Sequence, residues 1–285
     1  METPPLVRKS PLLLNEEHVT QVLTVFLQEE LYRTGLTKAV IGLSGGVDSA
    51  LSTYLAARAL GSENVHVLLM PYRTSSPESI DDAEAVVNDL GIASERFSIT
   101  AAADALFAET ERSIGPMDKT RRGNIMARLR MIALYDRSQA LGALVIGTSN
   151  KTESLLGYTT IFGDNASAIN PLGDLYKTQV WQIGRYVGVP ERILNKPPSA
   201  DLWPGQTDEG ELGISYREVD ELLFYMIDRR EHDAKLEARG FQAAFIRSIR
   251  EKIQQAQYKR RPPLVAKISS RTINVDFRYP RDWGT

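Results

Sequence analysis

The first half of this sequence alternates short apolar runs with longer segments of helical spacing, and this alternation limits the possible folds more than any other feature. Short apolar runs bounded by turn residues predict buried strands, and apolar residues three and four positions apart predict helices. We therefore expect strands at residues 38–43, 64–70, 95–99 and 143–147, and helices at residues 17–33, 49–60, 78–90, 101–112 and 121–140. Strands that alternate with helices are joined by right-handed crossovers. The sequence thus predicts an α/β fold, with a doubly wound, mostly parallel sheet flanked by helices.

The second half of the chain changes in texture after Gly147, where loops rich in Gly, Asn, Pro and Thr join fewer helices. We expect these helices at residues 177–188, 215–230 and 241–257. The middle helix carries a stripe with helical spacing that predicts a core-facing surface, formed by Val219, Leu222, Leu223, Met226 and Ile227. One interpretation of the segment "QTDEGELG" just before it, which the sequence leaves open, is a helix cap with Asp208 as N-cap and Glu211 three residues on.

No linker separates the two halves, so the chain is expected to form one domain over residues 1–285. Within it, an α/β core at 1–175 is expected to be completed by a helical C-terminal extension at 176–285. A length of 285 residues is enough to bury a core of this size.

Composition excludes several functional classes. The 34 Lys and Arg residues nearly balance the 36 Asp and Glu residues, so nothing indicates binding to nucleic acid or to a membrane surface. No stretch resembles a signal peptide or is long enough to span a bilayer, and the cytoplasm is the expected location. The absence of cysteine excludes disulfides, thiolate metal sites and a cysteine nucleophile, and with the nucleophile a built-in thiol-dependent glutaminase. The histidines, His18, His66 and His232, lack the spacing of zinc ligands.

The turn "SGGVDS", residues 44–49, lies between a predicted strand and a predicted helix, where open α/β sheets bind ligands. Free backbone N–H groups and the helix dipole favour an anion there, the two glycines admit phosphate oxygens, and the two serines offer hydroxyl donors. Asp48 would repel a bare phosphate, so it predicts Mg²⁺ between the two. The turn is neither a dinucleotide fingerprint nor a Walker loop, and the alternative is a strand-to-helix turn capped by serine.

A second polar segment, residues 147–180, follows the predicted strand 143–147 and begins on the same edge of the sheet. Thr148 and Glu153 can therefore face whatever the first turn binds. Glu153 can act as the second carboxylate on magnesium, and Lys177 can offset the charge of pyrophosphate, a role for which the "SGGVDS" turn has no lysine of its own.

Several longer segments extend the pattern over nearly the whole chain: "SGGVDSA", "MPYRTSSPES", "NIMARLRMIALY", "GTSNKTE", "LYKTQV", "KPPSADLWPGQTDEGELGISY" and "YKRRPP". In these segments the sequence resembles the NAD synthetases, which belong to the PP-loop ATP pyrophosphatases and have the fold of the adenine nucleotide alpha hydrolases. The resemblance is to the ammonia-dependent, single-domain form. It implies that ATP adenylates the nicotinate carboxylate of deamido-NAD with release of pyrophosphate, and that ammonia then displaces AMP.

The resemblance assigns roles to individual residues. It implies contacts to ATP by Gly42, Leu43, Ser44, Gly45, Gly46, Val47, Asp48, Ser49, Thr148, Lys177 and Ser199. It implies contacts to deamido-NAD by Asn124, Arg128, Glu153, Tyr258 and Lys259. Asp48 and Glu153 would be the magnesium ligands, and Asp164 would stand near the reacting carboxylate and ammonia. Asp48, Glu153, Asp164 and Lys177 would thus be the catalytic residues.

The predicted helix 121–140 has two distinct faces. Asn124, Arg128, Met131 and Tyr135 share one of them, as a substrate-facing helix requires. The apolar stripe of Ile125, Leu129 and Ile132 forms the other. Without the resemblance, a solvated polar surface is the less favoured alternative for the first face.

The sequence departs from the short ammonia-dependent enzymes at Ile161, Ala168, Ser199 and Tyr258, where those enzymes typically have Lys, Asp, Thr and His. At these places it is similar to the synthetase portion of the longer glutamine-dependent enzymes, which carry a further amidohydrolase domain with a cysteine nucleophile. Since this chain has no cysteine, free ammonia or a separate glutaminase is the expected nitrogen source. The resemblance also implies a homodimer, to which helices 17–33 and 121–140 would contribute.

Two other functions are open at this point. One is a related PP-loop enzyme similar to a GMP or asparagine synthetase, which shares the loop and the adenylation chemistry. The other is a module that binds ATP without turnover. Asp48 and Glu153 disfavour the second, because binding alone does not need a magnesium site beside an activated phosphate.

Overall fold

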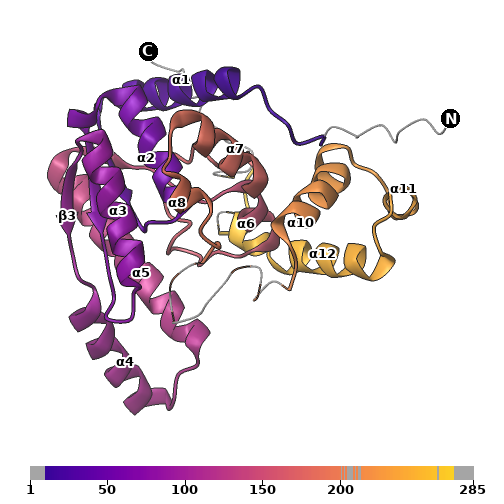
Figure 1. Ribbon diagram of the computed structural model, residues 1–285. Helices are drawn as coiled ribbons and strands as arrows, with labels where there is room; N and C mark the ends of the chain where they lie inside the picture. The colour runs from indigo at the N-terminus through magenta and orange to yellow at the C-terminus, as the bar shows by residue number, and fades with distance from the viewer. Residues whose placement is uncertain are drawn as a thin grey trace.

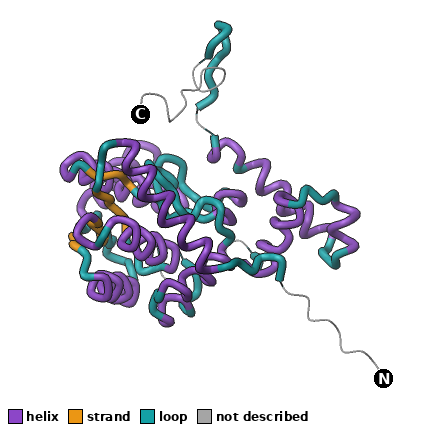
Figure 2. The backbone as a smooth tube through the Cα atoms, turned by 90° about the horizontal axis from the view of Figure 1, so that it is seen from above, coloured by secondary structure: helices purple, strands orange, loops and turns teal. Residues whose placement is uncertain are grey.

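The computed structural model describes residues 10–199, 201, 203, 208, 210, 213–261 and 263–272. Its centre is a four-stranded parallel sheet in the order β3-β2-β1-β4. The strands are β1 (Lys38–Gly42), β2 (Val65–Leu69), β3 (Ala93–Arg96) and β4 (Ala143–Val145). Ala39 of β1 lies opposite Val65 on one side and Leu144 on the other. This sheet, with helices on both faces, confirms the predicted α/β fold (Figures 1 and 2).

Helices cover both faces of the sheet because the strands are apolar on both sides. The helices of the first half are α1 (Glu16–Thr34), α2 (Val47–Leu60), α3 (Pro77–Leu90), α4 (Thr100–Ile114) and α5 (Lys119–Leu141). Ala39 and Ile41 of β1 pack into a core shared with α1, α2, α3 and α7. Val40, which points the other way, packs into a core formed with α4 and α5. Alternate residues of one strand thus pack against the helix layers on the two faces of the sheet.

The central helix of the fold is α2, which is buried along most of its length between the sheet and the pair α1 and α7. Small and hydroxylated residues make this burial possible. The Ser52 hydroxyl donates to the carbonyl oxygen of Gly147 at 3.0 Å, and that of Thr53 donates to the carbonyl oxygen of Ser49 at 2.8 Å. The loop that precedes α2 is therefore attached to a helix that packs closely on three neighbouring elements.

The helices of the second half are α6 (Lys151–Leu156), α7 (Lys177–Val187), α8 (Glu191–Leu194), α10 (Tyr216–Leu223), α11 (Asp233–Ala238) and α12 (Ala243–Gln255). Helices α7 and α8 pack into the core of the sheet domain, whereas α10, α11 and α12 form a lobe beside it, at the right of Figure 1. Val219, Leu222 and Leu223 of α10 are fully buried in a core shared with α6, α7 and α12, which confirms the predicted stripe. In the described part of the chain, no helix is long and apolar enough to cross a membrane.

Some predicted boundaries were wrong. The strand predicted at 95–99 lies at 93–96. The backbone N–H groups of Phe97 and Ile99 still donate to the carbonyl oxygens of Leu69 and Pro71, but Pro71 has no N–H group with which to continue the ladder. The helix predicted at 215–230 ends at Leu223 and continues as a π-helical turn, Phe224–Asp228. The short helices α6, α8 and α11 were not predicted, because so few residues show no clear period.

Asp208 is not the N-cap of the helix that follows it. That helix, α10, begins at Tyr216 after the N-cap Ser215. Asp208 is buried instead and accepts a hydrogen bond from the Tyr216 hydroxyl at 3.1 Å. Glu211, the other half of the expected cap, lies outside the described residues.

Replacing Leu51, which is fully buried in α2, tests the importance of this helix for the fold. Leu51→Ala removes methyl groups from the main core, and we expect the free energy of unfolding to fall by about 2 to 5 kcal/mol. Chemical denaturation measures this loss. Leu264→Ala, at a side chain that is 89% exposed, is the control and should change stability by less than about 0.5 kcal/mol. Equal effects of the two substitutions would contradict the central place given to α2.

Candidate active site

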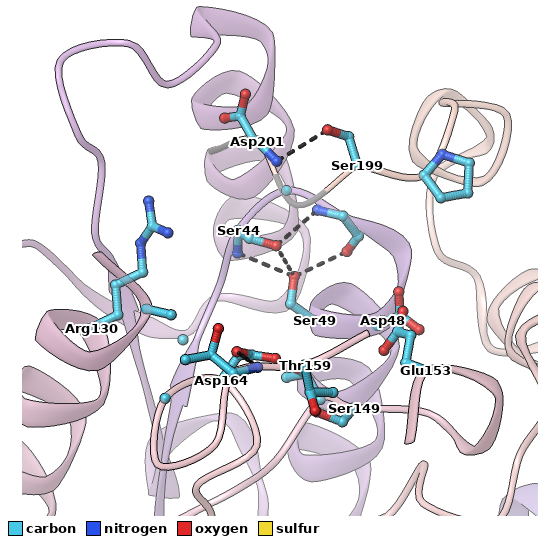
Figure 3. A pocket seen from close by; sticks show the side chains of 18 of the residues that line it. Ser44, Asp48, Ser49, Arg130, Ser149, Glu153, Thr159, Asp164, Ser199 and Asp201 are labelled. Atoms are coloured by element: carbon cyan, nitrogen blue, oxygen red, sulfur yellow. Dashed lines mark hydrogen bonds between the residues drawn. The ribbon is translucent and has the colours of Figure 1, made fainter. Parts of the chain in front are cut away.

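The phosphate loop, residues 42–49, joins the end of β1 to the first turn of α2 at the carboxyl edge of the sheet. Two serine side chains brace it from within (Figure 3). The Ser49 hydroxyl accepts from the backbone N–H of Ser44 at 3.1 Å and donates to the carbonyl oxygen of Gly46 at 3.0 Å. The hydroxyl oxygens of Ser44 and Ser49 lie 3.0 Å apart. These hydroxyls shape the loop, so the backbone N–H groups at the start of α2 are its main donors for an anion.

Gly45 is the position in this loop where a glycine is required. Its φ of +80° lies in the left-handed region, and a Cβ atom there would come within 2.0 Å of the carbonyl oxygen of Ser79. The first turn of α3 therefore packs directly against the phosphate loop. At Gly46, by contrast, a Cβ atom would meet only the Ser44 hydroxyl oxygen, at 3.4 Å.

The loop opens into a cavity of about 1100 Å³. Most of the residues selected from the sequence line it: Gly42, Leu43, Ser44, Gly45, Gly46, Val47, Asp48, Ser49, Asn124, Thr148, Glu153, Asp164, Lys177, Ser199 and Lys259. Leu43 and Val47 are buried in the core, so their backbone is the part that can serve a ligand. Arg128 and Tyr258 do not line the cavity. Arg128 donates to the carbonyl oxygen of Ile161 at 3.2 Å, and Tyr258 is 62% exposed.

Helix α5 faces the cavity with a different set of residues from the predicted one. The residues that line the cavity are Thr120, Asn124, Ala127, Arg130, Met131 and Leu134. Tyr135 lies outside this set, and Ile132 of the expected apolar stripe is 58% exposed, whereas Ile125 and Leu129 pack against the core. The cationic side chain that α5 presents to the cavity is therefore that of Arg130, whose Nε donates to the carbonyl oxygen of Met70 at 3.1 Å.

At the centre of the site a buried ammonium group lies between two carboxylates. Lys177 Nζ, at the start of α7, is 2.5 Å from Asp48 Oδ2 and 3.2 Å from Glu153 Oε1. Asn150 joins the same group, because its side-chain amide donates to Asp48 Oδ1 at 2.9 Å and its side-chain oxygen caps α6 through the N–H of Glu153. The structure thus brings together three residues that the sequence analysis assigned to one site.

Burial and mutual repulsion shift the pKa values of this cluster. Burial raises the pKa of Glu153 to about 8, and the negative charge of Asp48 adds to the effect, whereas the charge of Lys177 opposes it. Burial alone would lower the pKa of Lys177, but the charges of Asp48 and Glu153 outweigh it and raise that pKa. Carboxyl groups with shifted pKa values in a cavity are typical of a functional site.

Asp208 is a site residue that the sequence interpretation missed. It is buried, it lines the same cavity, and burial raises the pKa of its carboxyl group. Its charge also acts on Glu153 and on Lys177. Two part-buried carboxyl groups, those of Asp48 and Glu153, and the buried carboxyl group of Asp208 thus act on a single ammonium group, and this excess of negative charge favours a divalent cation.

Asp48 and Glu153 fit a magnesium ion that is shared with a substrate. Mg²⁺ typically takes one or two protein carboxylates and completes its coordination with phosphate oxygens and water. Within the described residues no group of three or more His, Cys, Asp or Glu side chains is arranged to hold an ion. Two carboxylates beside a phosphate loop match a magnesium site that is completed by the phosphates of a substrate.

The segment 157–164 contributes another wall of the cavity, through residues 157–160, 163 and 164. Asp164 Oδ1 accepts from the backbone N–H of Thr160 at 2.7 Å, and the Thr160 hydroxyl donates to Asn124 Oδ1 at 2.7 Å. Lys259 Nζ donates to the carbonyl oxygens of Gly157 at 2.8 Å and Thr159 at 2.6 Å. The Asp164 side chain is open to the cavity, yet the protein around it restricts its solvation and raises its pKa. Asn124, Asp164 and Lys259 therefore converge on one wall.

Comparison with known proteins identifies the family. The family model for NAD synthase matches residues 19–263. The chain belongs to the NAD synthase family. An NH(3)-dependent NAD(+) synthetase of Trichlorobacter lovleyi is 55% identical over 275 residues, which are 96% of this chain and 99% of that protein.

Solved structures of similar proteins agree with this membership. An NMN synthetase from Francisella tularensis superposes with a TM-score of 0.79 and 34% identity, covering 89% of this chain and 99% of that one. An NH3-dependent NAD synthetase from Campylobacter jejuni, in complex with the nitrate ion, gives a TM-score of 0.76 and 32% identity, covering 89% and 100%. The resemblance drawn from the sequence segments is confirmed at the level of the NAD synthase family.

The two glycines of the phosphate loop provide a matched pair of substitutions. Gly45→Ala forces an alanine into the left-handed region and against Ser79, so we expect unfolding free energy to fall by about 2 kcal/mol or more. Gly46→Ala has room for its methyl group and should cost much less. Chemical denaturation without ligand compares them. Equal losses would show that contact with α3 does not determine the shape of the loop.

Removing either carboxylate from the central cluster should abolish most activity. We expect Asp48→Asn and Glu153→Gln each to lower kcat/KM about a hundredfold or more, on the order of 3 kcal/mol of transition-state stabilisation, while circular dichroism shows a folded chain. Asp174→Asn is the control, because this exposed carboxylate pairs with Lys151 outside the cavity. Turnover near that of the wild type by either variant at saturating magnesium would show that the metal ligands are misassigned.

Proposed function

We propose that this chain is an ammonia-dependent NAD synthetase, which converts deamido-NAD, ATP and ammonia into NAD, AMP and pyrophosphate. The observation that carries the proposal is the cluster of the buried Lys177 with Asp48 and Glu153, beside a phosphate loop that has no lysine of its own. Membership of the NAD synthase family supports it, as does the printed name of the relative from Trichlorobacter lovleyi.

ATP binds in this proposal with its phosphates on the loop 42–49, where the N-terminal N–H groups of α2 donate hydrogen bonds to the phosphate oxygens. Thr148 and Ser199 contact the nucleotide from other walls of the cavity. Asp48 and Glu153 hold magnesium, which when bound neutralises charge on the phosphates and stabilises pyrophosphate as a leaving group. Lys177 supplies the positive charge that a Walker loop would place within the loop itself.

Deamido-NAD binds along the wall formed by segment 157–164, where Asn124, Glu153 and Lys259 are its proposed contacts. Arg128 and Tyr258 lie outside the cavity, and we assign them to the part of this long substrate that extends beyond it. A carboxylate oxygen of the nicotinate ring attacks the α-phosphorus of ATP, and the bond to pyrophosphate breaks. The product is an acyl-adenylate.

Ammonia then attacks the carbonyl carbon of the adenylate, and AMP leaves with the former carboxylate oxygen. The proton lost by nitrogen needs an acceptor close to the wall of segment 157–164. Asp164 is the proposed acceptor, because its pKa is raised and its side chain is open to the cavity. A cavity that restricts water protects the adenylate from hydrolysis while ammonia arrives.

Free ammonia, or ammonia from a separate glutaminase, is the proposed nitrogen source, since the chain has no cysteine to attack a glutamine side chain. We propose that residues 1–285 act as one domain in the cytoplasm. We also propose a homodimer built on α1 and α5. Apolar side chains that these helices leave exposed support this assembly: Val22, Val25, Tyr32, Ile132, Tyr135 and Leu141.

Three alternative functions are weighed against this proposal. Membership of the NAD synthase family disfavours a GMP or asparagine synthetase, and the paired carboxylates disfavour a module that only binds ATP. Amidation of nicotinate mononucleotide is a further candidate, because the similar structure from Francisella tularensis is that of an NMN synthetase.

Product analysis tests the proposal. The purified chain is incubated with MgATP, ammonium and one acceptor, which is deamido-NAD, nicotinate mononucleotide or xanthosine monophosphate. We expect NAD, AMP and pyrophosphate in equal amounts from deamido-NAD, and near inactivity when glutamine replaces ammonium. Formation of ADP, a clear preference for another acceptor, or rapid glutamine-driven synthesis by the chain alone would refute it.

A further inference from the structure

Asp220, on α10, is a buried carboxylate that the proposed reaction does not use. Its side chain has no solvent exposure and does not line the cavity. Oδ1 accepts from the Thr152 hydroxyl at 2.5 Å, and Oδ2 accepts from the backbone N–H and the hydroxyl of Thr178, both at 2.8 Å. Burial raises the pKa of this carboxyl group, and the hydrogen bonds that Thr152 and Thr178 donate to it act in the opposite direction, in favour of the ionised form.

The partners of Asp220 are the sequence neighbours of two central site residues. Thr152 precedes Glu153 in α6, and Thr178 follows Lys177 in α7. Thr152 Oγ1 also accepts from the backbone N–H of Lys177 at 3.0 Å, so its own proton is directed to Asp220. A continuous chain of hydrogen bonds thus runs from Lys177 through Thr152 to Asp220 and back to Thr178.

These contacts lie at the first turns of two helices. The N-terminal N–H groups of a helix lack intrahelical partners, and a negative charge placed there is favourable. Asp220 supplies one carboxylate to both α6 and α7, which lie beside α10 (Figure 1). It therefore bridges the helix that carries Glu153 and the helix that carries Lys177.

Desolvating an isolated carboxylate in an apolar core is unfavourable by several kcal/mol, and Val219, Leu222 and Leu223 around Asp220 show that this core is otherwise apolar. The three hydrogen bonds offset this cost only when both helix ends are in place. A correct geometry of the site and a stable position of Asp220 thus depend on each other.

We propose that Asp220 is a positioning residue, which holds Glu153 and Lys177 at the separation that binding of magnesium with ATP requires. The inference rests on the proposed function only for its activity readout. It assigns a specific task to the C-terminal extension, namely to fix two cavity residues from behind. Residues that orient metal ligands from a second layer typically change metal affinity 10- to 100-fold when they are replaced.

The test uses Thr152, which links Asp220 to α7, because Asp220→Asn alters three buried hydrogen bonds at once and puts folding itself at risk. Thr152→Val keeps the volume of the side chain and removes the hydroxyl, whereas Thr152→Ser keeps the hydroxyl. Calorimetry measures binding of α,β-methylene ATP, an analogue that cannot release pyrophosphate, over a series of magnesium concentrations. Steady-state kinetics on the same proteins separate kcat from the KM for deamido-NAD.

We expect Thr152→Val to raise the magnesium concentration for half-maximal binding about tenfold or more and to lower kcat, with the KM for deamido-NAD within about twofold of wild type. Thr152→Ser should bind as the wild type does. Glu231→Gln is the matched control, because Glu231 is also a buried carboxylate of the extension but pairs with Arg239 and Lys235. It should lower the thermal unfolding midpoint without changing the magnesium requirement.

Wild-type binding by Thr152→Val would overturn the inference, as would equal shifts in the valine and serine variants or an equal shift in Glu231→Gln. If Thr152→Val does not fold, Thr178→Val and Thr178→Ser make the same comparison at the other hydroxyl, with the backbone N–H bond of Thr178 retained. A wild-type chain that binds the analogue with magnesium but forms no NAD would refute the proposed function, and the binding comparison would still decide the role of Asp220.

Discussion

The structure depends on one buried charge, the ammonium group of Lys177. Such a group is stable away from water only with close anionic partners. Asp48 and Glu153 meet this requirement from segments 129 and 24 residues distant along the chain. Their convergence ties the start of α2 to the starts of α6 and α7, so the phosphate loop, the segment after β4 and the C-terminal extension form one site.

The same cluster carries more negative than positive charge, which is unusual for a site selected for stability alone. Burial is the main cause of the raised pKa values of Glu153 and Asp208, and the nearby charge of Asp48 adds to both as part of this excess. A divalent cation held with the phosphates of ATP would relieve it. The cluster is thus more stable with a bound cation than without one. This is what electrostatic preorganisation of a catalytic site requires.

Sequence reasoning succeeded where a local pattern determined the outcome. The apolar runs around β1 and β2 predicted the parallel sheet, and "SGGVDS" at a strand-to-helix turn predicted a ligand-binding edge that Asp48 now shares with Glu153. It failed where tertiary contacts decide. Asp208 has the local pattern of a helix cap, and only the packing of Tyr216 shows that it belongs to the cavity. The orientation of α5, which directs Arg130 rather than Arg128 toward the cavity, likewise follows from packing against the sheet.

The central claim is that this site activates a carboxylate by joining it to the α-phosphorus of ATP. Isotope transfer tests it most directly, with deamido-NAD that carries oxygen-18 in both carboxylate oxygens. If the acyl-adenylate forms, mass spectrometry will find one labelled oxygen in AMP for each NAD produced, and the other label in the new amide. Label in orthophosphate or in water, with unlabelled AMP, would contradict the account.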